Sequence, residues 1–246
     1  DHGGGIDAMI ARFGGNRADW LDLSTGINPV PYPLPTLPAD AWTALPDRAA
    51  TASFEAAARR FWSVPDEAAV LAAPGASALI ARIPALLPKG RAMIRKATYN
   101  EHAAAFAETG WQVTHEGPAQ ARVVVHPNNP TGDLWDGVDE DWGDRPLVVI
   151  DESFCDEALN QSLIHHAGPG VITLKSIGKF WGLAGLRLGA AIGDPAMLAQ
   201  LAHWLGPWPV SGPALAIGTA ALNDADWAKV TRTRLAKDAT RLTLYF

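Results

Sequence analysis

Short apolar runs and helical segments alternate along the middle of the chain. From about residue 70, the apolar runs have the length and composition of buried β-strands, and we expect strands at 70–73, 93–95, 122–125, 147–150, 171–174 and 186–192. Segments compatible with helices lie between them, at about 75–87, 102–109 and 196–204. This alternation predicts an α/β domain with a mostly parallel central sheet flanked by helices.

The two ends of the chain have a different pattern. In residues 1–48 we expect a short helix at 6–13, a brief strand at 20–23 and an extended arm where proline crowds 29–38. A helix is expected at 51–62, and a mostly helical segment at 214–246 follows the proline-rich stretch 206–213.

These patterns divide the chain into three parts. We expect an N-terminal arm with part of a small domain at 1–48, a large domain at 49–212, and the start of a C-terminal small domain at 213–246. The last segment is an amphipathic helix with no element after it to cover its apolar face. We therefore expect the small domain to be incomplete in this polypeptide.

Composition excludes several classes of protein. Hydrophobic residues make up 48% and charged residues 19% of the 246 residues, as in globular proteins. The formal net charge of −6 provides no basic surface for nucleic acid. No apolar run approaches the roughly 20 residues that span a bilayer, and the start of the chain lacks signal-peptide features. With a single cysteine, Cys155, we expect a cytoplasmic protein that binds neither membrane nor nucleic acid.

Four chemically distinctive residues follow the carboxyl ends of predicted strands, namely Gly75, Asn129, Asp151 and Lys179. In open α/β sheets, functional residues gather beyond these ends, because the ends of parallel strands meet at one edge. We therefore expect the four residues to form one site.

Lys179 belongs to a Ser-x-x-Lys motif in a glycine-rich connection between two strands. A lysine amine in such a place can form a Schiff base with an aldehyde cofactor, of which pyridoxal phosphate is the usual one. The Ser176 hydroxyl and the Arg187 guanidinium are donors that a phosphate dianion needs beside that amine. The alternative is a solvent-exposed loop, and the placement shared with the other three residues favours the chemical interpretation.

Asp151 and Asn129 each allow two interpretations. A carboxylate at the end of an apolar strand is costly unless it has a cationic partner, and a protonated pyridine nitrogen would be one. A helix N-cap explains Asp151 equally well. Asn129 lies in Asn-Pro-Thr-Gly, where its amide can donate to a phenolic oxygen or close an Asx-turn.

The remaining candidates are weaker when each is taken alone. Gly75-Ala76-Ser77 begins a predicted helix, whose free N–H groups can bind an anion or simply start the helix. Tyr99 and His102 can stack on or hydrogen-bond around an aromatic ring, although aromatic residues at such positions are more often core. We predict no metal site, because histidines such as His165 and His166 lack ligand spacing.

In this order, the motifs resemble those of the fold-type I, aspartate-aminotransferase-like enzymes, which use pyridoxal phosphate. The resemblance implies that 49–212 is the cofactor-binding domain, that Lys179 is the Schiff-base lysine and that Asp151 is the pyridinium partner. It also implies that Asn129 binds the ring oxygen, and that the enzyme is a homodimer. Further cofactor contacts are implied for Gly75, Ala76, Ser77, Tyr99, His102, Ser176 and Arg187.

The N-terminus is similar to that of one group within this superfamily. His2-Gly3-Gly4 and the stretch 21–29 resemble the start of the threonine-phosphate decarboxylases of cobalamin synthesis. This resemblance implies decarboxylation of O-phospho-L-threonine to 1-amino-2-propanol phosphate. It also implies that the small phosphorylated amino acid is bound near His2, Gly3, Gly4, Ile27 and Asn28.

Other functions stay open at this point. A histidinol-phosphate aminotransferase is the nearest alternative, although such enzymes usually carry tyrosine where this chain has Phe154. Leu45 and Gly5 also depart from the pattern of relatives, and no match is found for the arginine that grips the substrate carboxylate. A regulatory domain that binds pyridoxal phosphate and a structural α/β domain without cofactor are the alternatives from other classes.

Overall fold

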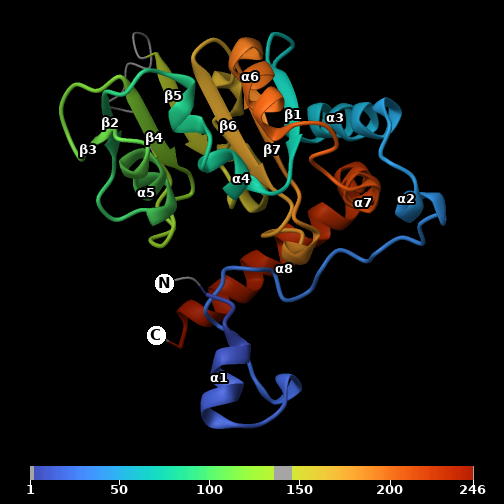
Figure 1. The fold of residues 1–246 in the computed structure, drawn as a ribbon. Coiled ribbons are helices and arrows are strands. Elements are labelled where there is room, and N and C mark those ends of the chain that lie inside the picture. Colours follow the sequence, from blue (N-terminus) through green and yellow to red (C-terminus); the bar gives the residue numbers. More distant parts are fainter. Residues whose placement is uncertain (1–2, 136–145, 246) are drawn as a thin grey trace.

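The computed structural model describes residues 3–135 and 146–245. Within these residues the chain forms a seven-stranded mixed sheet in the order β1-β7-β6-β5-β4-β2-β3 (Figure 1). The strands are β1 (Ala69–Ala73), β2 (Arg91–Ile94), β3 (Gln112–Thr114), β4 (Ala121–Val125), β5 (Leu147–Asp151), β6 (Val171–Ser176) and β7 (Gly189–Gly193).

Strand direction places several carboxyl ends at one edge of the sheet. The neighbours β4, β5 and β6 are parallel, with Asp151 paired to Val125 on one side and Leu174 on the other. β7 is antiparallel to both β6 and β1, and its Gly189 is paired with Ser176 and with Ala73. β1 therefore has the same direction as β6, and the ends of β1, β4, β5 and β6 meet at the same edge.

Helices cover both faces of the sheet. The α-helices are α1 (Ile6–Phe13), α2 (Asp40–Thr43), α3 (Arg48–Trp62), α4 (Ala76–Ile80), α5 (Asn100–Glu108), α6 (Pro195–Leu205), α7 (Gly212–Asn223) and α8 (Ala225–Thr243). Short 3₁₀ turns lie at Arg17–Asp19, Ile83–Leu86, Cys155–Gln161, Ile164–His166 and Ala184–Leu186. No helix of the described residues has both the length and the apolar character needed to cross a membrane.

The core has two main parts, one on each face of the sheet. Residues of α4, α5 and α6 pack on one face, and residues of α3 and α7 pack on the other. Successive side chains of β6 point to opposite faces of the sheet. Ile172 and Leu174 pack with the residues of α4, α5 and α6, while Nζ of Lys175 lies on the other face, 5.6 Å from the ring centre of Trp62 of α3. α7 is largely buried in the second core, so the segment that begins at 212 is packed into the main body. The predicted division into domains at 48/49 and 212/213 stays a prediction.

The N-terminal arm lies outside these two layers and runs beside α8 (Figure 1). Its helix α1 has no buried residue. The apolar side chains of Leu21 and Leu23 are exposed to 80% and 83%, respectively. The arm is nevertheless attached to the body, since Asn28 and Tyr32 donate hydrogen bonds to the backbone of residues 179–181.

The predicted α/β class and mostly parallel sheet are confirmed, but two boundaries and one predicted strand were wrong. The helix expected at 75–87 ends at Ile80 and is replaced by the 3₁₀ turn at 83–86, where Pro84 has no N–H to donate. The strand expected from 186 begins at Gly189, because Arg187 has a left-handed backbone with φ of 51°. The segment 20–23 is not a strand, since no strand of the described residues pairs with it.

Candidate active site

A cavity lies at the edge of the sheet where the strand ends meet, and Lys179 lines it. The lysine follows β6 on a tight turn and is half-buried. Its Nζ lies 5.2 Å from the ring centre of Phe154. Burial lowers the pKa of the Lys179 amine, with opposition from the Asp151 charge and support from the charge of Arg187. More of this amine is therefore uncharged and nucleophilic at a given pH than for a lysine in water.

Asp151 is the buried last residue of β5 and also lines this first cavity. Its Oδ2 lies 2.8 Å from Nε2 of His102, and its Oδ1 accepts hydrogen bonds from N and Oγ of Ser153 at 3.0 and 2.6 Å. Burial opposes ionisation, but the contacts with His102 and then Ser153 outweigh it and lower the pKa of Asp151. The site therefore holds a fixed negative charge on Asp151, which the contact with His102 stabilises.

A group of phosphate-type donors lines the same cavity. Gly75, Ala76 and Ser77 come from the turn between β1 and α4, and Ser176 comes from the end of β6. Arg187 completes the group. Backbone N–H groups, serine hydroxyls and a guanidinium are the donors that bind a phosphate dianion.

This group of donors requires close backbone approach. Gly75 has φ of 83°, and a Cβ at this position would lie 2.6 Å from Nη2 of Arg187. A Cβ on Gly189 would likewise lie 2.8 Å from the backbone N of Ala76. Arg187 itself has the left-handed backbone that a non-glycine residue seldom adopts. Such strain is tolerated at functional sites when the surroundings hold it in place.

Two adjacent asparagines have opposite environments. Asn128 is 4% exposed and uses its amide in hydrogen bonds to Thr98, Thr131 and the carbonyl of Ala97. Asn129 lines the cavity, and its amide has no hydrogen-bond partner among the described residues. The structure therefore assigns Asn128 to holding the loop and leaves Asn129 available for a ligand.

A second cavity adjoins the first and shares four lining residues with it, namely Tyr99, Asn129, Phe154 and Lys179. The other lining residues are Gly3, Ser24, Thr25, Gly26, Thr98, Asn100, Pro127, Asn128, Pro130, Gly132 and Glu157. The second cavity therefore combines hydroxyl and amide groups with glycine and proline backbone and one carboxylate, and Lys179 lies at the junction of the two cavities.

The predicted substrate residues are only partly assembled at this second cavity. Gly3 lines it, and the N–H of Gly4 donates to Oγ of Ser24 at 2.8 Å. Ile27 and Asn28 line neither of the two cavities. His2 lies outside the described residues. The individual roles assigned to these residues and to the cofactor contacts stay predictions.

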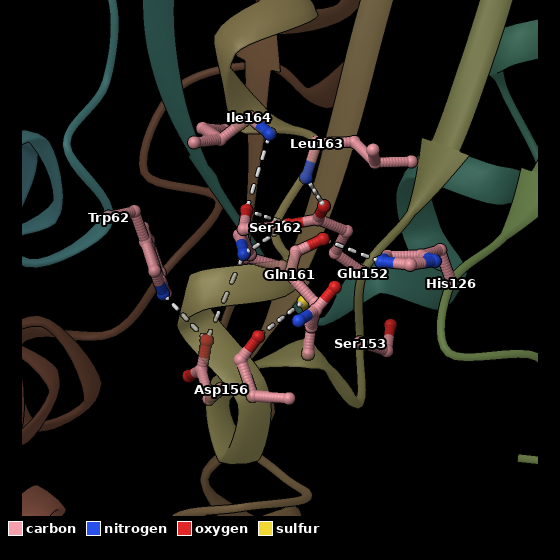
Figure 2. Close-up of polar contacts among 12 residues, drawn as sticks. Trp62, His126, Glu152, Ser153, Asp156, Gln161, Ser162, Leu163 and Ile164 are labelled. Carbon is pink, nitrogen blue, oxygen red and sulfur yellow. Dashed lines mark hydrogen bonds and ion pairs between the residues drawn. The ribbon is translucent and has the colours of Figure 1, made fainter. Parts of the chain in front are cut away.

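Glu152, the residue after Asp151, belongs to a buried charge network that sequence reasoning missed (Figure 2). Glu152 accepts hydrogen bonds from Lys175 at 2.5 Å, from Ser162 at 2.7 Å and from the N–H of Leu163 at 2.5 Å. Asp156 accepts from the indole N–H groups of Trp62 and Trp181 at 2.8 and 2.9 Å. Lys175 within the apolar run of β6 was the available signal, because a fully buried lysine needs a partner.

One group of potential metal ligands is present among the described residues. His126, Glu152 and Cys155 offer ligand atoms within 4.8 Å of one another. However, Nδ1 of His126 accepts from the N–H of Trp135 at 3.0 Å, and Nε2 lies 2.8 Å from the carbonyl oxygen of Gln161. Burial raises the pKa of the Cys155 thiol to about 12. With these groups occupied or protonated, we assign no metal to this cluster.

Comparison with known proteins identifies the family. The model of the aminotransferase class I and II family matches residues 114–246. A threonine-phosphate decarboxylase of Sinorhizobium sp is 41% identical over 235 residues, covering 89% of this chain and 70% of that protein. The threonine-phosphate decarboxylase of Pseudomonas aeruginosa is 37% identical over 258 residues, covering 98% and 76%.

A solved structure agrees at the level of the fold. The histidinol-phosphate aminotransferase from Clostridium acetobutylicum superposes with a TM-score of 0.73 over 89% of this chain and 74% of that chain, at 16% identity. The chain belongs to the aminotransferase class I and II family, as its sheet and lysine-centred site indicate. Within that family it groups with the threonine-phosphate decarboxylases. Membership confirms the expected fold-type I class and the expected cofactor, pyridoxal phosphate.

Proposed function

We propose that this protein removes carbon dioxide from O-phospho-L-threonine, giving 1-amino-2-propanol phosphate for cobalamin synthesis. The observation that carries the proposal is the extent of the similarity to decarboxylases. The two alignments cover 89% and 98% of this chain, so the longer one includes the arm whose residues 24–26 line the second cavity. Phe154, which has no hydroxyl to offer a cofactor, also favours this reaction over the aminotransferase alternative.

The donor set of the first cavity fits a phosphorylated pyridine aldehyde. Ser77, Ser176 and Arg187 would hold its phosphate, Asn129 would bind its ring oxygen, and Lys179 would carry its aldehyde carbon. When bound, this cofactor supplies an electron sink for the charge left on the substrate carbon after a bond breaks. The ionised carboxylate of Asp151 would keep the ring nitrogen protonated, as such a sink requires.

The residues of this chain have two tasks in the proposed reaction. The Lys179 amine, with its lowered pKa, exchanges a proton readily and would return one to the carbon that has lost carbon dioxide. The Thr25 hydroxyl would orient the phosphorylated side chain from the second cavity, since Ser24 and Thr98 donate their hydroxyl protons to Asp22 and Asn128. Substrate orientation decides which bond at the carbon breaks, so the second cavity would set the reaction type.

We also propose that the protein is a cytoplasmic homodimer. Apolar side chains of the arm and its surroundings are strongly exposed, with Phe13 at 64%, Leu21 at 80% and Trp42 at 70%. Exposed apolar surface of this kind is typical of protein interfaces. The single cysteine is buried and unpaired, which is consistent with a reducing compartment. Sedimentation equilibrium that shows only monomer at micromolar concentration would contradict the dimer.

The decisive experiment measures carbon dioxide release from O-phospho-L-threonine with pyridoxal phosphate and no 2-oxo acid, using the full-length protein. We expect release, and a loss of about 1,000-fold or more in Lys179→Ala. Asp226→Asn, at an exposed position on α8, is the matched surface control and should be fully active. Amine transfer from histidinol phosphate to 2-oxoglutarate without carbon dioxide release would instead establish the aminotransferase.

A further inference from the structure

The arm holds the backbone of the segment that carries the reactive lysine. The backbone N–H of Asn28 donates to the carbonyl oxygen of Lys179 at 3.1 Å, and its side-chain Nδ2 donates to that of Phe180 at 2.8 Å. The N–H of Tyr32 donates to the carbonyl oxygen of Trp181 at 2.9 Å. Three consecutive carbonyl groups of the lysine segment therefore accept hydrogen bonds from the arm.

The arm also packs closely against the end of the lysine segment, at Trp181 and Gly182. Gly182 has φ of 68°, and a Cβ at this position would lie 2.7 Å from Cα of Pro31 and 2.8 Å from the carbonyl oxygen of Asn28. Tyr32 packs edge-on against Trp181, with ring centres 5.8 Å apart. No space remains between the arm and the end of the lysine turn.

The Asn28 side chain connects this contact to α8. It is only 7% exposed, and its Oδ1 accepts from Nη2 of Arg234 at 2.6 Å and from the N–H of Val30 at 3.1 Å. Both ends of the amide are therefore occupied within the protein. Arg234 is in turn paired with Asp238 on the same helix at 3.4 Å.

We propose that Asn28 is a positioning residue for Lys179, and that Arg234 orients Asn28 for this task. The proposal rests on the proposed function, because it takes Lys179 as the reactive amine. It replaces direct substrate binding, the role predicted for Asn28 from resemblance, since the side chain faces the lysine segment and α8 and lines neither cavity.

The arrangement also links the substrate to the lysine. Ser24, Thr25 and Gly26 line the second cavity and precede Asn28 closely in the chain. The segment 24–28 would therefore contact the substrate and also hold the Lys179 backbone, which fixes the position of one relative to the other. Displacement of a reacting group by about 1 Å can reduce a rate about 100-fold. Loss of the link should therefore reduce turnover more than substrate affinity.

The test is Asn28→Asp, which keeps the oxygen that Arg234 and Val30 bind and replaces the N–H donor to Phe180 with an oxygen. We expect kcat for carbon dioxide release to fall about 10- to 100-fold, with KM changed less than about threefold. Arg234→Met should reduce kcat about three- to tenfold, and Arg234→Lys, which keeps a donor, should restore most of it.

A matched control is Asn223→Asp. Asn223 also accepts a hydrogen bond from an arginine, Arg60 at 3.0 Å, but lies on the surface at the end of α7. It should retain wild-type kcat and KM. A raised KM with unchanged kcat in Asn28→Asp would show substrate binding instead, and unchanged values of both would remove the proposed role.

A second readout separates this proposal from the proposed function. Borohydride reduction of the protein with pyridoxal phosphate, followed by peptide mass analysis, reports attachment at Lys179 without any substrate. We expect wild-type attachment at Lys179 and about tenfold weaker cofactor binding in Asn28→Asp. Wild-type attachment without carbon dioxide release would overturn only the reaction. Equal cofactor affinity in the folded variant and wild type would overturn the positioning role.

Discussion

The two adjoining cavities are built from different kinds of structure. In the first, Asp151 and Ser176 are strand residues whose positions follow from the register of β4, β5, β6 and β7. In the second, Gly3 and residues 24–26 come from the arm, whose helix α1 buries no residue. The cavity assigned to the cofactor is thus built on the ends of the strands and the turns that follow them, while the adjoining cavity is completed by the arm.

This difference has a chemical consequence. A buried strand end can hold a charge in one place and alter its pKa, as His102 and Ser153 do for Asp151. An exposed segment supplies neutral hydroxyl groups whose arrangement can vary without disturbing the sheet. We therefore propose that the sheet provides the general cofactor chemistry and that the arm selects the substrate and the bond to be broken.

Two glycine-to-alanine substitutions, one in each cavity, test whether the two cavities have separate tasks. Each adds a single Cβ atom. In Gly75→Ala the new Cβ would lie 2.6 Å from Arg187, on a backbone with φ of 83°. Because the phosphate donors would be displaced, we expect pyridoxal phosphate to bind about 100-fold more weakly, measured by equilibrium dialysis. At saturating cofactor, KM for O-phospho-L-threonine should be close to wild type.

The control for this change is Gly185→Ala, where an added Cβ meets no atom within 4 Å. It should leave cofactor affinity unchanged. If Gly75→Ala altered KM and left the cofactor dissociation constant as in wild type, the first cavity would not be the cofactor site.

Gly26→Ala is the corresponding change in the second cavity. Its Cβ would lie 2.9 Å from Cε1 of Phe154, so the arm or the ring must move where the two cavities join. We expect KM for O-phospho-L-threonine to rise about tenfold, while the dissociation constant of pyridoxal phosphate stays within about twofold of wild type. Steady-state kinetics and dialysis measure the two quantities.

Gly5→Ala is a suitable control for the arm, because a Cβ there meets no atom within 4 Å. It should leave KM unchanged. Weaker cofactor binding in Gly26→Ala, comparable with that in Gly75→Ala, would mean that the two cavities act as one site and that the separation is wrong.

Residues at the strand ends could be predicted from the sequence, whereas the contacts of the arm could not. Asp151 and Ser176 could be placed at one edge because buried apolar runs identify strands, and the ends of parallel strands meet. The role of Asn28 could not, because its partners Phe180 and Arg234 lie 152 and 206 residues away and are brought together only by the fold. The amino-acid composition of β7 likewise gave no indication that this strand is antiparallel to its neighbours.

Local conformation limited the prediction in a second way. Arg187 interrupts an apolar run with a left-handed backbone, which the residue type alone does not reveal. β3 has only three residues, all partly or fully exposed, so it carries no apolar signal. These are positions where tertiary contacts override local preference, and the first of them lies in the active site.

The smallest predicted effect concerns the charges that surround Lys179. Its pKa lies below the ordinary value of 10.5, chiefly because of burial, and the negative charge of Asp151 limits the decrease. Since only the uncharged amine attacks an aldehyde, the rate of imine formation by cofactor-free protein should rise with pH to a plateau. Pyridoxal, which lacks the phosphate, measures this rate without the contribution of phosphate donors.

In Asp151→Asn the charge that favours protonated Lys179 is lost, so the midpoint of this pH profile should move to lower pH. Asp226→Asn, far from the cavity in the chain and exposed, should leave the midpoint unchanged. A shift of the Asp151→Asn midpoint to higher pH would show that Asp151 does not stabilise the charged amine. The sheet would then position the carboxylate without controlling the lysine electrostatically, and the contrast between the two cavities would rest on geometry alone.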